Sequence, residues 1–72
     1  MKTRYQFIYF VLVEQKPKTG VYSCRNNRSE AELGEIRWHG PWRQYCYFPT
    51  CQAVYSAGCL ADIQEFIAAL KG

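Results

Sequence analysis

The stretch Ile36–Pro49 reads IRWHGPWRQYCYFP and holds two Trp, two Tyr, one Phe, two Arg and the only His. Its first part alternates, with Ile36 and Trp38 on one face of a strand and Arg37 and His39 on the other. The Gly-Pro pair that follows suits a turn. The next residues, WRQYCYF, are rich in aromatic side chains, which are common in strands, and they predict the returning strand. The stretch therefore predicts a β-hairpin.

The length of the hairpin loop determines which side chains share a face. A three-residue loop over residues 39–41 is a common length, and it puts Trp38 opposite Trp42. Cys46 and Phe48 then continue the same face, which we expect to be the core face, with both tryptophans mainly buried. The other face carries Glu35, Arg37, Arg43, Tyr45 and Tyr47. A loop one residue shorter or longer would exchange the faces of one strand.

Three further segments predict strands outside this hairpin, and the first strand of the hairpin itself is expected to span residues 33–39. Residues 4–14 are apolar at both alternating sets of positions, which favours a central strand or one covered on both sides. Residues 20–26 predict a second strand and residues 33–39 a third, in which Gly34 leaves room for a neighbouring ring. Residues 52–56 predict a short fifth strand.

The C-terminal segment, residues 59–72, predicts an amphipathic helix. Its apolar stripe recurs at spacings of three and four and comprises Leu60, Ile63, Phe66, Ile67 and Leu70. Ser56 or Gly58 is expected to cap its start, and Lys71 and Gly72 are plausible stop signals. The stripe must cover one face of the sheet. The fold class expected is α+β, an antiparallel meander of four to five strands with one helix packed on one face, in a single domain over residues 1–72.

Composition and the N-terminus bear on the compartment. Hydrophobic residues make up 49% of the chain and aromatics 17%, which is enough for a folded core and unlike a disordered tail. The apolar run after the basic start resembles a signal peptide, but no small-residue cleavage site follows it, and it is too short to span a bilayer. We therefore expect a cytoplasmic protein without membrane association.

The cysteines suggest neither a metal site nor catalysis. In a reducing compartment, Cys24, Cys46, Cys51 and Cys59 are expected to be free thiols. Structural zinc sites use closely spaced ligand pairs, and only the pair at 46 and 51 is close. Cys59 with His39 forms a weak nucleophile pair, because no third group orients it. No phosphate loop or serine elbow is present, so we expect no enzyme activity, no cofactor and no metal.

A resemblance covers most of the chain from Val21 onward. The run LGEIRWHGPWRQYCYFP followed by AGCLADIQEFI resembles a small group of uncharacterised one-domain bacterial and phage proteins. That group has a Gly-x-Ile-x-Trp…Trp-Arg-x-Tyr-x-Phe core and a closing Leu-x-x-Ile-x-x-Phe-Ile helix. The resemblance implies strands followed by a helix, and it brings no activity or ligand.

Two functions of different classes remain open. The net charge of +3 permits an anionic partner without requiring one. The first is a non-catalytic module that binds single-stranded nucleic acid by base stacking and phosphate contacts. Its expected site residues are Arg25, Arg28, Arg37, Arg43, Tyr45 and Tyr47. The alternative is a protein-interaction or homodimerising accessory module. A contiguous positive face would favour nucleic acid, and an apolar patch or open strand edge would favour protein.

Overall fold

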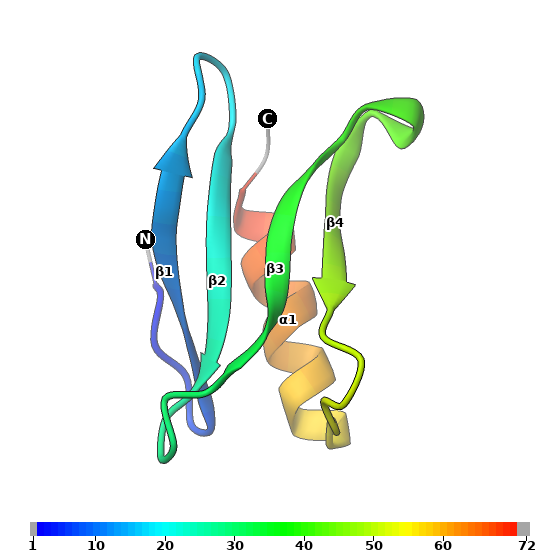
Figure 1. Cartoon of the computed structure of the whole chain (residues 1–72). Helices are drawn as coiled ribbons and strands as arrows, with labels where there is room; N and C mark the ends of the chain where they lie inside the picture. The colour runs from blue at the N-terminus through cyan, green and yellow to red at the C-terminus, as the bar shows by residue number, and fades with distance from the viewer. Residues whose placement is uncertain (1, 71–72) are drawn as a thin grey trace.

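The chain forms a four-stranded antiparallel sheet with one helix across one of its faces (Figure 1). The computed structural model describes residues 2–70. The strands are β1 (Ile8–Gln15), β2 (Gly20–Asn26), β3 (Glu32–His39) and β4 (Gln44–Pro49), and they follow one another across the sheet in chain order. A short 3-10 helix, η1 (Gly40–Trp42), joins β3 to β4, and α1 (Ala57–Ala69) follows. The predicted α+β meander with a C-terminal helix is confirmed.

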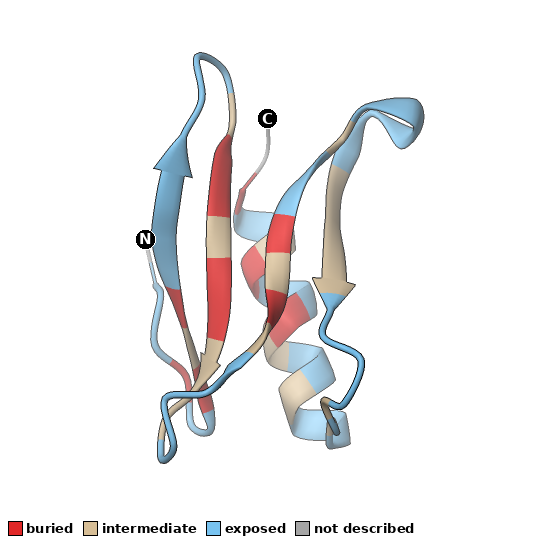
Figure 2. Ribbon diagram, viewed as in Figure 1, coloured by how far each residue is buried: buried red, intermediate tan, exposed pale blue. Residues whose placement is uncertain are grey.

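The core lies between α1 and the sheet. The Phe66 ring of α1 stacks on Phe10 of β1 at 4.0 Å between centroids and meets Tyr22 of β2 edge-on at 5.2 Å. Ile36 of β3 and Cys24 of β2 are fully buried beside them. Buried residues therefore lie on the start of β1, on β2 and β3, and on the inner side of α1, as Figure 2 shows. Each large ring removed from water contributes a substantial apolar area to stability.

The helix is as predicted except at one position of its stripe. Ile63, Phe66 and Leu70 are buried and Ile67 packs partly against the core, but Leu60 is half exposed. Cys59 replaces it on the packing side, because residues 59, 63, 66 and 70 lie on one side of a 3.6-residue helix. The start is capped by Ser56, whose hydroxyl accepts a hydrogen bond from the Cys59 amide at 3.2 Å. The predicted stop signals at residues 71 and 72 lie outside the described residues.

The first strand differs from the prediction in start and position. The chain folds back before Ile8, so that the amide of Phe10 donates to the Thr3 carbonyl at 2.8 Å. β1 therefore begins at Ile8, and it is an edge strand. The prediction of a central or doubly covered strand was wrong, because an apolar pattern reports a tendency to leave water and not the identity of the neighbours. Residues 11–15 are exposed.

The predicted fifth strand is also wrong. Within the described residues, 50–56 form an irregular connection between β4 and α1. A side chain holds this connection in place: the Tyr55 hydroxyl donates to the Leu33 carbonyl at 2.6 Å and lies 2.7 Å from the Tyr47 hydroxyl. The Thr50 amide also donates to the Leu33 carbonyl, at 2.9 Å, so a few hydrogen bonds attach this segment to the sheet without a ladder.

Candidate binding site between the hairpin turns

The link between β3 and β4 has four residues, 40–43, because His39 pairs with Gln44. η1 fills most of it, and Arg43 ends it in the left-handed region with φ 54°. This is one residue longer than the predicted loop, so the faces of β4 are exchanged relative to β3. Tyr45 and Tyr47 pair with Trp38 and Ile36 on the helix side of the sheet.

The two tryptophans are not core residues. Trp42 lies in η1 and is 67% exposed, and Trp38 is 38% exposed although it is on the helix side of β3. Trp38 meets the Tyr45 ring edge-on at 5.5 Å, while the Trp42 ring meets His39 edge-on at 5.1 Å. The prediction that both are mainly buried was wrong. The longer link carries Trp42 beyond the sheet. Trp38 pairs with Tyr45 of β4 but with no residue of β2, because the pairing of β2 with β3 ends at Ile36.

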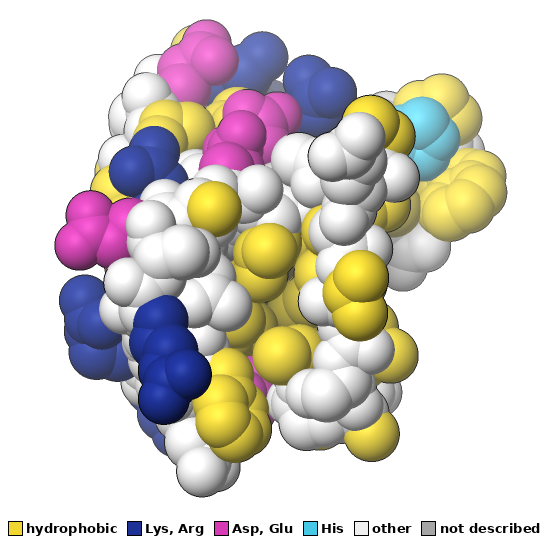
Figure 3. All heavy atoms as spheres, turned by 60° about the horizontal axis from the view of Figure 1, so that its bottom comes forward, with side chains coloured by type: hydrophobic (Ala, Val, Ile, Leu, Met, Phe, Trp, Pro, Cys, Tyr) yellow, Lys and Arg dark blue, Asp and Glu magenta, His cyan; other side chains and the backbone are white. Residues whose placement is uncertain are grey.

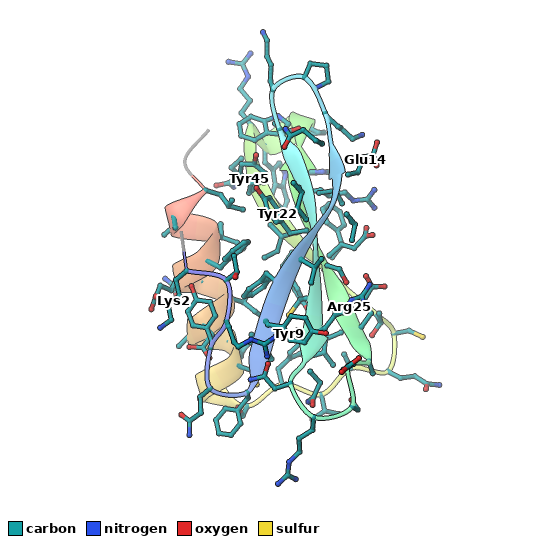
Figure 4. All side chains as sticks on the ribbon, turned by 90° about the vertical axis from the view of Figure 1, so that its left-hand side faces the viewer. Lys2, Tyr9, Glu14, Tyr22, Arg25 and Tyr45 are labelled. Carbon is teal, nitrogen blue, oxygen red and sulfur yellow. The ribbon has the colours of Figure 1, made fainter. Side chains whose placement is uncertain are left out.

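The six predicted site residues do not form one surface. Tyr45 points to the helix side of the sheet, where the core residue Tyr22 also lies, whereas Arg25 points to the open side (Figure 4). Arg28 lies in the β2–β3 turn, at the end of the molecule opposite the other two turns (Figure 1). Arg43 is in the link and pairs with no strand residue, so it does not face Arg37, which pairs with Cys46. The predicted site is therefore divided among four places: the helix side of the sheet, its open side, the β2–β3 turn and the β3–β4 link.

Two of these arginines lie beside carboxylates on the open face of the sheet. The Ser23 hydroxyl accepts from Arg25 Nε at 3.1 Å and donates to Glu32 at 2.7 Å. Arg37 Nε lies 3.9 Å from a Glu35 carboxylate oxygen. The open face thus alternates in charge, which makes it a weak attractor for a polyanion.

A cleft opens at the other end, where the two hairpins separate. The last paired residues of β2 and β3 toward this end are Tyr22 and Ile36. Beyond them the Gly20 amide donates across to the Tyr45 hydroxyl at 3.3 Å. A cavity of about 420 Å³ lies here, and its lining comes from both hairpins: Lys16, Thr19, Val21, Arg37, Trp38, His39 and Phe48. We call this the polar cavity.

A second cavity adjoins the first. It measures about 530 Å³, its lining is mostly apolar, and it is bordered by Lys16, Pro17, Lys18, Thr19 and Trp38. We call this the apolar cavity. The link residues Trp42 and Arg43 line neither cavity, but the Trp42 ring meets His39 at the wall of the polar cavity. We call the two cavities together with Trp42 and Arg43 the hairpin cleft. Lys16, Thr19 and Trp38 border both cavities.

The hairpin cleft is locally basic. Residues 16–20 and 37–43 contain Lys16, Lys18, Arg37 and Arg43 and no acidic residue, so they hold four of the nine Lys and Arg of the chain. The Arg37 guanidinium lies over the Phe48 ring at 4.5 Å, which holds this cation at the wall of the polar cavity.

The sequence contained a signal for this cleft that the prediction did not use. In a meander the first and third turns lie at the same end of the sheet. A four-stranded meander therefore places the turns KPKT and GPWR at the same end of the sheet, and both combine Pro with cations. The sequence does not indicate how deep the space between these two turns is.

The opposite end of the molecule has a different arrangement. Figure 3 views that end, where hydrophobic side chains gather in a central hollow and most Lys and Arg side chains lie apart at the margin. Aromatic and cationic groups also meet near this end, where the Arg4 guanidinium lies over the Tyr9 ring at 4.5 Å. The hairpin cleft differs in leaving two tryptophan rings exposed.

A buried polar cluster lies under α1. Tyr47, Tyr55 and Cys24 contribute hydroxyl and thiol groups to it. Burial raises the pKa of the Cys24 thiol to about 11, and burial followed by the hydrogen bond with Tyr55 raises the pKa of Tyr47. These groups therefore remain protonated at neutral pH and act as structural hydrogen-bonding groups.

The residues weighed for catalysis or metal binding lie apart. Cys59 is in the first turn of α1, whereas His39 is at the hairpin-turn end (Figure 1). Across residues 2–70, no three His, Cys, Asp or Glu side chains come close enough together to hold a metal ion. The four thiols are unpaired, with Cys51 the most exposed.

Comparisons with family models, curated proteins and solved structures found no match to this chain. The resemblance to the small phage and bacterial group therefore stays a prediction. Of the helices within the described part of the chain, none has the length and apolar character needed to cross a membrane.

Proposed function

We propose that this protein is a non-catalytic cytoplasmic module that binds single-stranded nucleic acid in the hairpin cleft. The observation that carries the proposal is the exposure of the Trp38 and Trp42 rings at an end of the molecule whose two cavities are lined by Lys16, Lys18 and Arg37. A large aromatic ring gains free energy by leaving water, so a surface that leaves two of them exposed fits a partner that covers them.

Single-stranded nucleic acid matches this chemistry in two ways. Unpaired bases present flat faces that stack on aromatic rings, and their phosphates pair with Lys and Arg. Duplex DNA exposes its phosphates, its sugars and the edges of its bases, but it keeps the flat faces of the bases stacked inside. The combination of exposed rings and cations in the cleft therefore favours a single strand.

The test is a fluorescence-anisotropy titration of labelled single-stranded DNA and RNA at several salt concentrations. We expect micromolar binding at low salt that weakens as salt is added, with the duplex of the same sequence bound less well. Arg43→Gln and Lys16→Gln should each lower the log–log salt slope by roughly 0.7, because each removes one phosphate contact.

Arg28→Gln is the matched control. It removes the same charge from an exposed position at the opposite end of the molecule, so it should leave the slope nearly unchanged. Equal losses for Arg28→Gln and Arg43→Gln would mean that binding follows net charge and does not use the cleft. No binding at low salt would end the proposal.

A protein-interaction function is the second candidate, and a separate observation favours it. The outer edge of β1 is covered by residues 3–5 only as far as Phe10. Val11, Leu12 and Val13 beyond it are 37–48% exposed. An exposed apolar edge strand is a template for adding a strand from another chain.

A further inference from the structure

The two cavities of the hairpin cleft differ in character and share three of their lining residues. Trp38 borders both, with Lys16 and Thr19. Beyond these three, the apolar cavity adds only Pro17 and Lys18, whereas the polar cavity adds Arg37 and His39 among others. At about 530 and 420 Å³, both are within the range of small-molecule sites, roughly 300–1,000 Å³.

The two cavities suit the two halves of a nucleotide. The apolar cavity offers the Trp38 indole and the Pro17 ring, which are flat or compact apolar surfaces against which a base can stack. The polar cavity offers one cation from the β1–β2 turn, Lys16, and one from β3, Arg37, with the His39 imidazole of β3 as a further nitrogen donor. Cationic donors of this kind bind phosphate oxygens.

The position of Arg37 supports the phosphate role. Its guanidinium is held over the Phe48 ring at 4.5 Å, while its contact with Glu35 is long, at 3.9 Å, and both side chains are substantially exposed. An exposed ion pair of this kind contributes little to stability. Arg37 can therefore exchange this carboxylate for a phosphate without a large loss.

We propose that the hairpin cleft takes one unpaired nucleotide of a single strand, with its base in the apolar cavity against Trp38 and its phosphate in the polar cavity beside Arg37 and Lys16. This inference rests on the proposed function and narrows it. It makes the base, and not only the backbone charge, part of what is recognised. It also predicts a preference for single strands, because a paired base cannot leave its stack without an energetic cost.

The experiment compares two oligonucleotides of equal length and phosphate number. One is oligo-dT, and the other carries tetrahydrofuran abasic sites in place of every base. Wild-type protein should bind oligo-dT about tenfold more tightly, since stacking one base is worth roughly that factor or more. Trp38→Leu should remove this preference by weakening oligo-dT binding alone, and Trp38→Phe, which keeps a ring, should restore part of it.

Arg37→Gln tests the other half of the site. It should weaken both oligonucleotides by the same factor and lower both salt slopes by roughly 0.7. In a Trp42→Phe background the remaining tryptophan is Trp38, so quenching of its fluorescence by oligo-dT, and not by the abasic strand, reports a base on its ring. Circular dichroism and urea denaturation verify that each variant is folded.

The outcomes separate this inference from the proposed function. Equal binding of both oligonucleotides by the wild type would overturn the base-in-cavity arrangement while leaving single-strand binding intact. The same conclusion would follow if Trp38→Leu weakened both strands equally. Failure of both strands to bind at low salt would overturn the proposed function itself.

Discussion

Gly34 is the residue at which the sheet leaves no room for a side chain. A Cβ built there would lie 2.5 Å from the Tyr47 hydroxyl oxygen and 2.7 Å from the Phe48 carbonyl oxygen. The expectation that Gly34 accommodates a neighbouring ring is confirmed, and the ring is Tyr47. Because that hydroxyl lies 2.7 Å from the Tyr55 hydroxyl, Gly34 also determines how residues 50–56 are attached.

We expect Gly34→Ala to lower the free energy of unfolding by about 1–3 kcal/mol, the usual cost of overpacking. The added methyl group must displace Tyr47 or the backbone of β4. Gly40→Ala is the control, because a Cβ there meets nothing within 4 Å, and its effect should stay within about 0.5 kcal/mol. Urea denaturation measures both, and equal effects would show that the close approach at Gly34 is unimportant.

Cys24 predicts how stability depends on alkaline pH. Burial raises the pKa of its thiol from 9.0 to about 11 in the folded protein. A group whose folded pKa is raised holds its proton more tightly in the folded state. Its contribution to stability is therefore complete below the unfolded pKa and is lost as pH rises toward the folded value.

Stability should accordingly fall between pH 9 and 11, by about 1.4 kcal/mol for each unit of pKa difference. Urea denaturation at a series of pH values measures this fall, and Cys24→Ala should make it shallower. Cys51→Ala, at an exposed thiol, should keep the wild-type profile. Raised pKa values of Tyr47 and Tyr55 act in the same direction, so some fall should remain in Cys24→Ala. An unchanged profile in Cys24→Ala would contradict the assignment.

At the scale of elements, the link between β3 and β4 has the largest effect on the site. One residue more than the three expected exchanges the faces of β4, so that Tyr45 and Tyr47 join the core side and Cys46 and Phe48 the open side. The same extra residue carries Trp42 out of the sheet into η1. The most aromatic segment of the chain thus supplies both the core, through its tyrosines, and the cleft, through its tryptophans.

This placement predicts that Trp42→Ala leaves the fold nearly as stable as the wild type. Trp42 is 67% exposed, so its truncation removes little buried area, and the expected change is within about 0.5–1 kcal/mol. Phe66→Ala, at a fully buried ring, should cost about 3–5 kcal/mol under the same conditions. Denaturation curves of the two variants measure the difference, and a loss above about 2 kcal/mol for Trp42→Ala would place its ring in the core after all.

At the scale of the whole molecule, the two functional candidates occupy different surfaces. The hairpin cleft lies at the end formed by the first and third turns, and the free edge of β1 runs along one side of the sheet (Figure 1). Only Glu14 is charged among residues 11–15, and edge strands that avoid association are usually interrupted by Lys or Pro. This edge lacks both.

We therefore expect concentration-dependent association through the β1 edge, and Val13→Lys should reduce it. Val13 is 48% exposed on this strand, whereas Val54, in the connection before α1, is 87% exposed. Val54→Lys adds the same charge away from the edge and should leave association unchanged. Sedimentation velocity over a range of protein concentrations measures this. A wild type that stays monomeric throughout, or equal effects of the two lysines, would rule out the edge as a contact surface.

The sequence by itself determined the class of fold and the elements that build it. The patterns that determined them are local. Side chains alternate around Ile36, and Ile63, Phe66 and Leu70 have helical spacing, because apolar side chains leave water on one face. Pro17 and Pro49 mark strand ends because proline has no backbone N–H to donate. These patterns were sufficient for the meander, for the C-terminal helix capped by Ser56 or Gly58, and for the close approach at Gly34; the structure shows that the cap is Ser56. They specify periodicity within an element, which depends only on neighbouring residues.

The tertiary structure decided which elements cover one another and which side chains share a surface. The length of the β3–β4 link was one residue from the expected value, and that single residue reversed the faces on which the Arg/Tyr site depended. The edge position of β1 and the exposure of Trp38 and Trp42 likewise depend on what packs beside them. Such relations between distant segments are set by the sum of many packing contacts, and a local pattern carries no record of them.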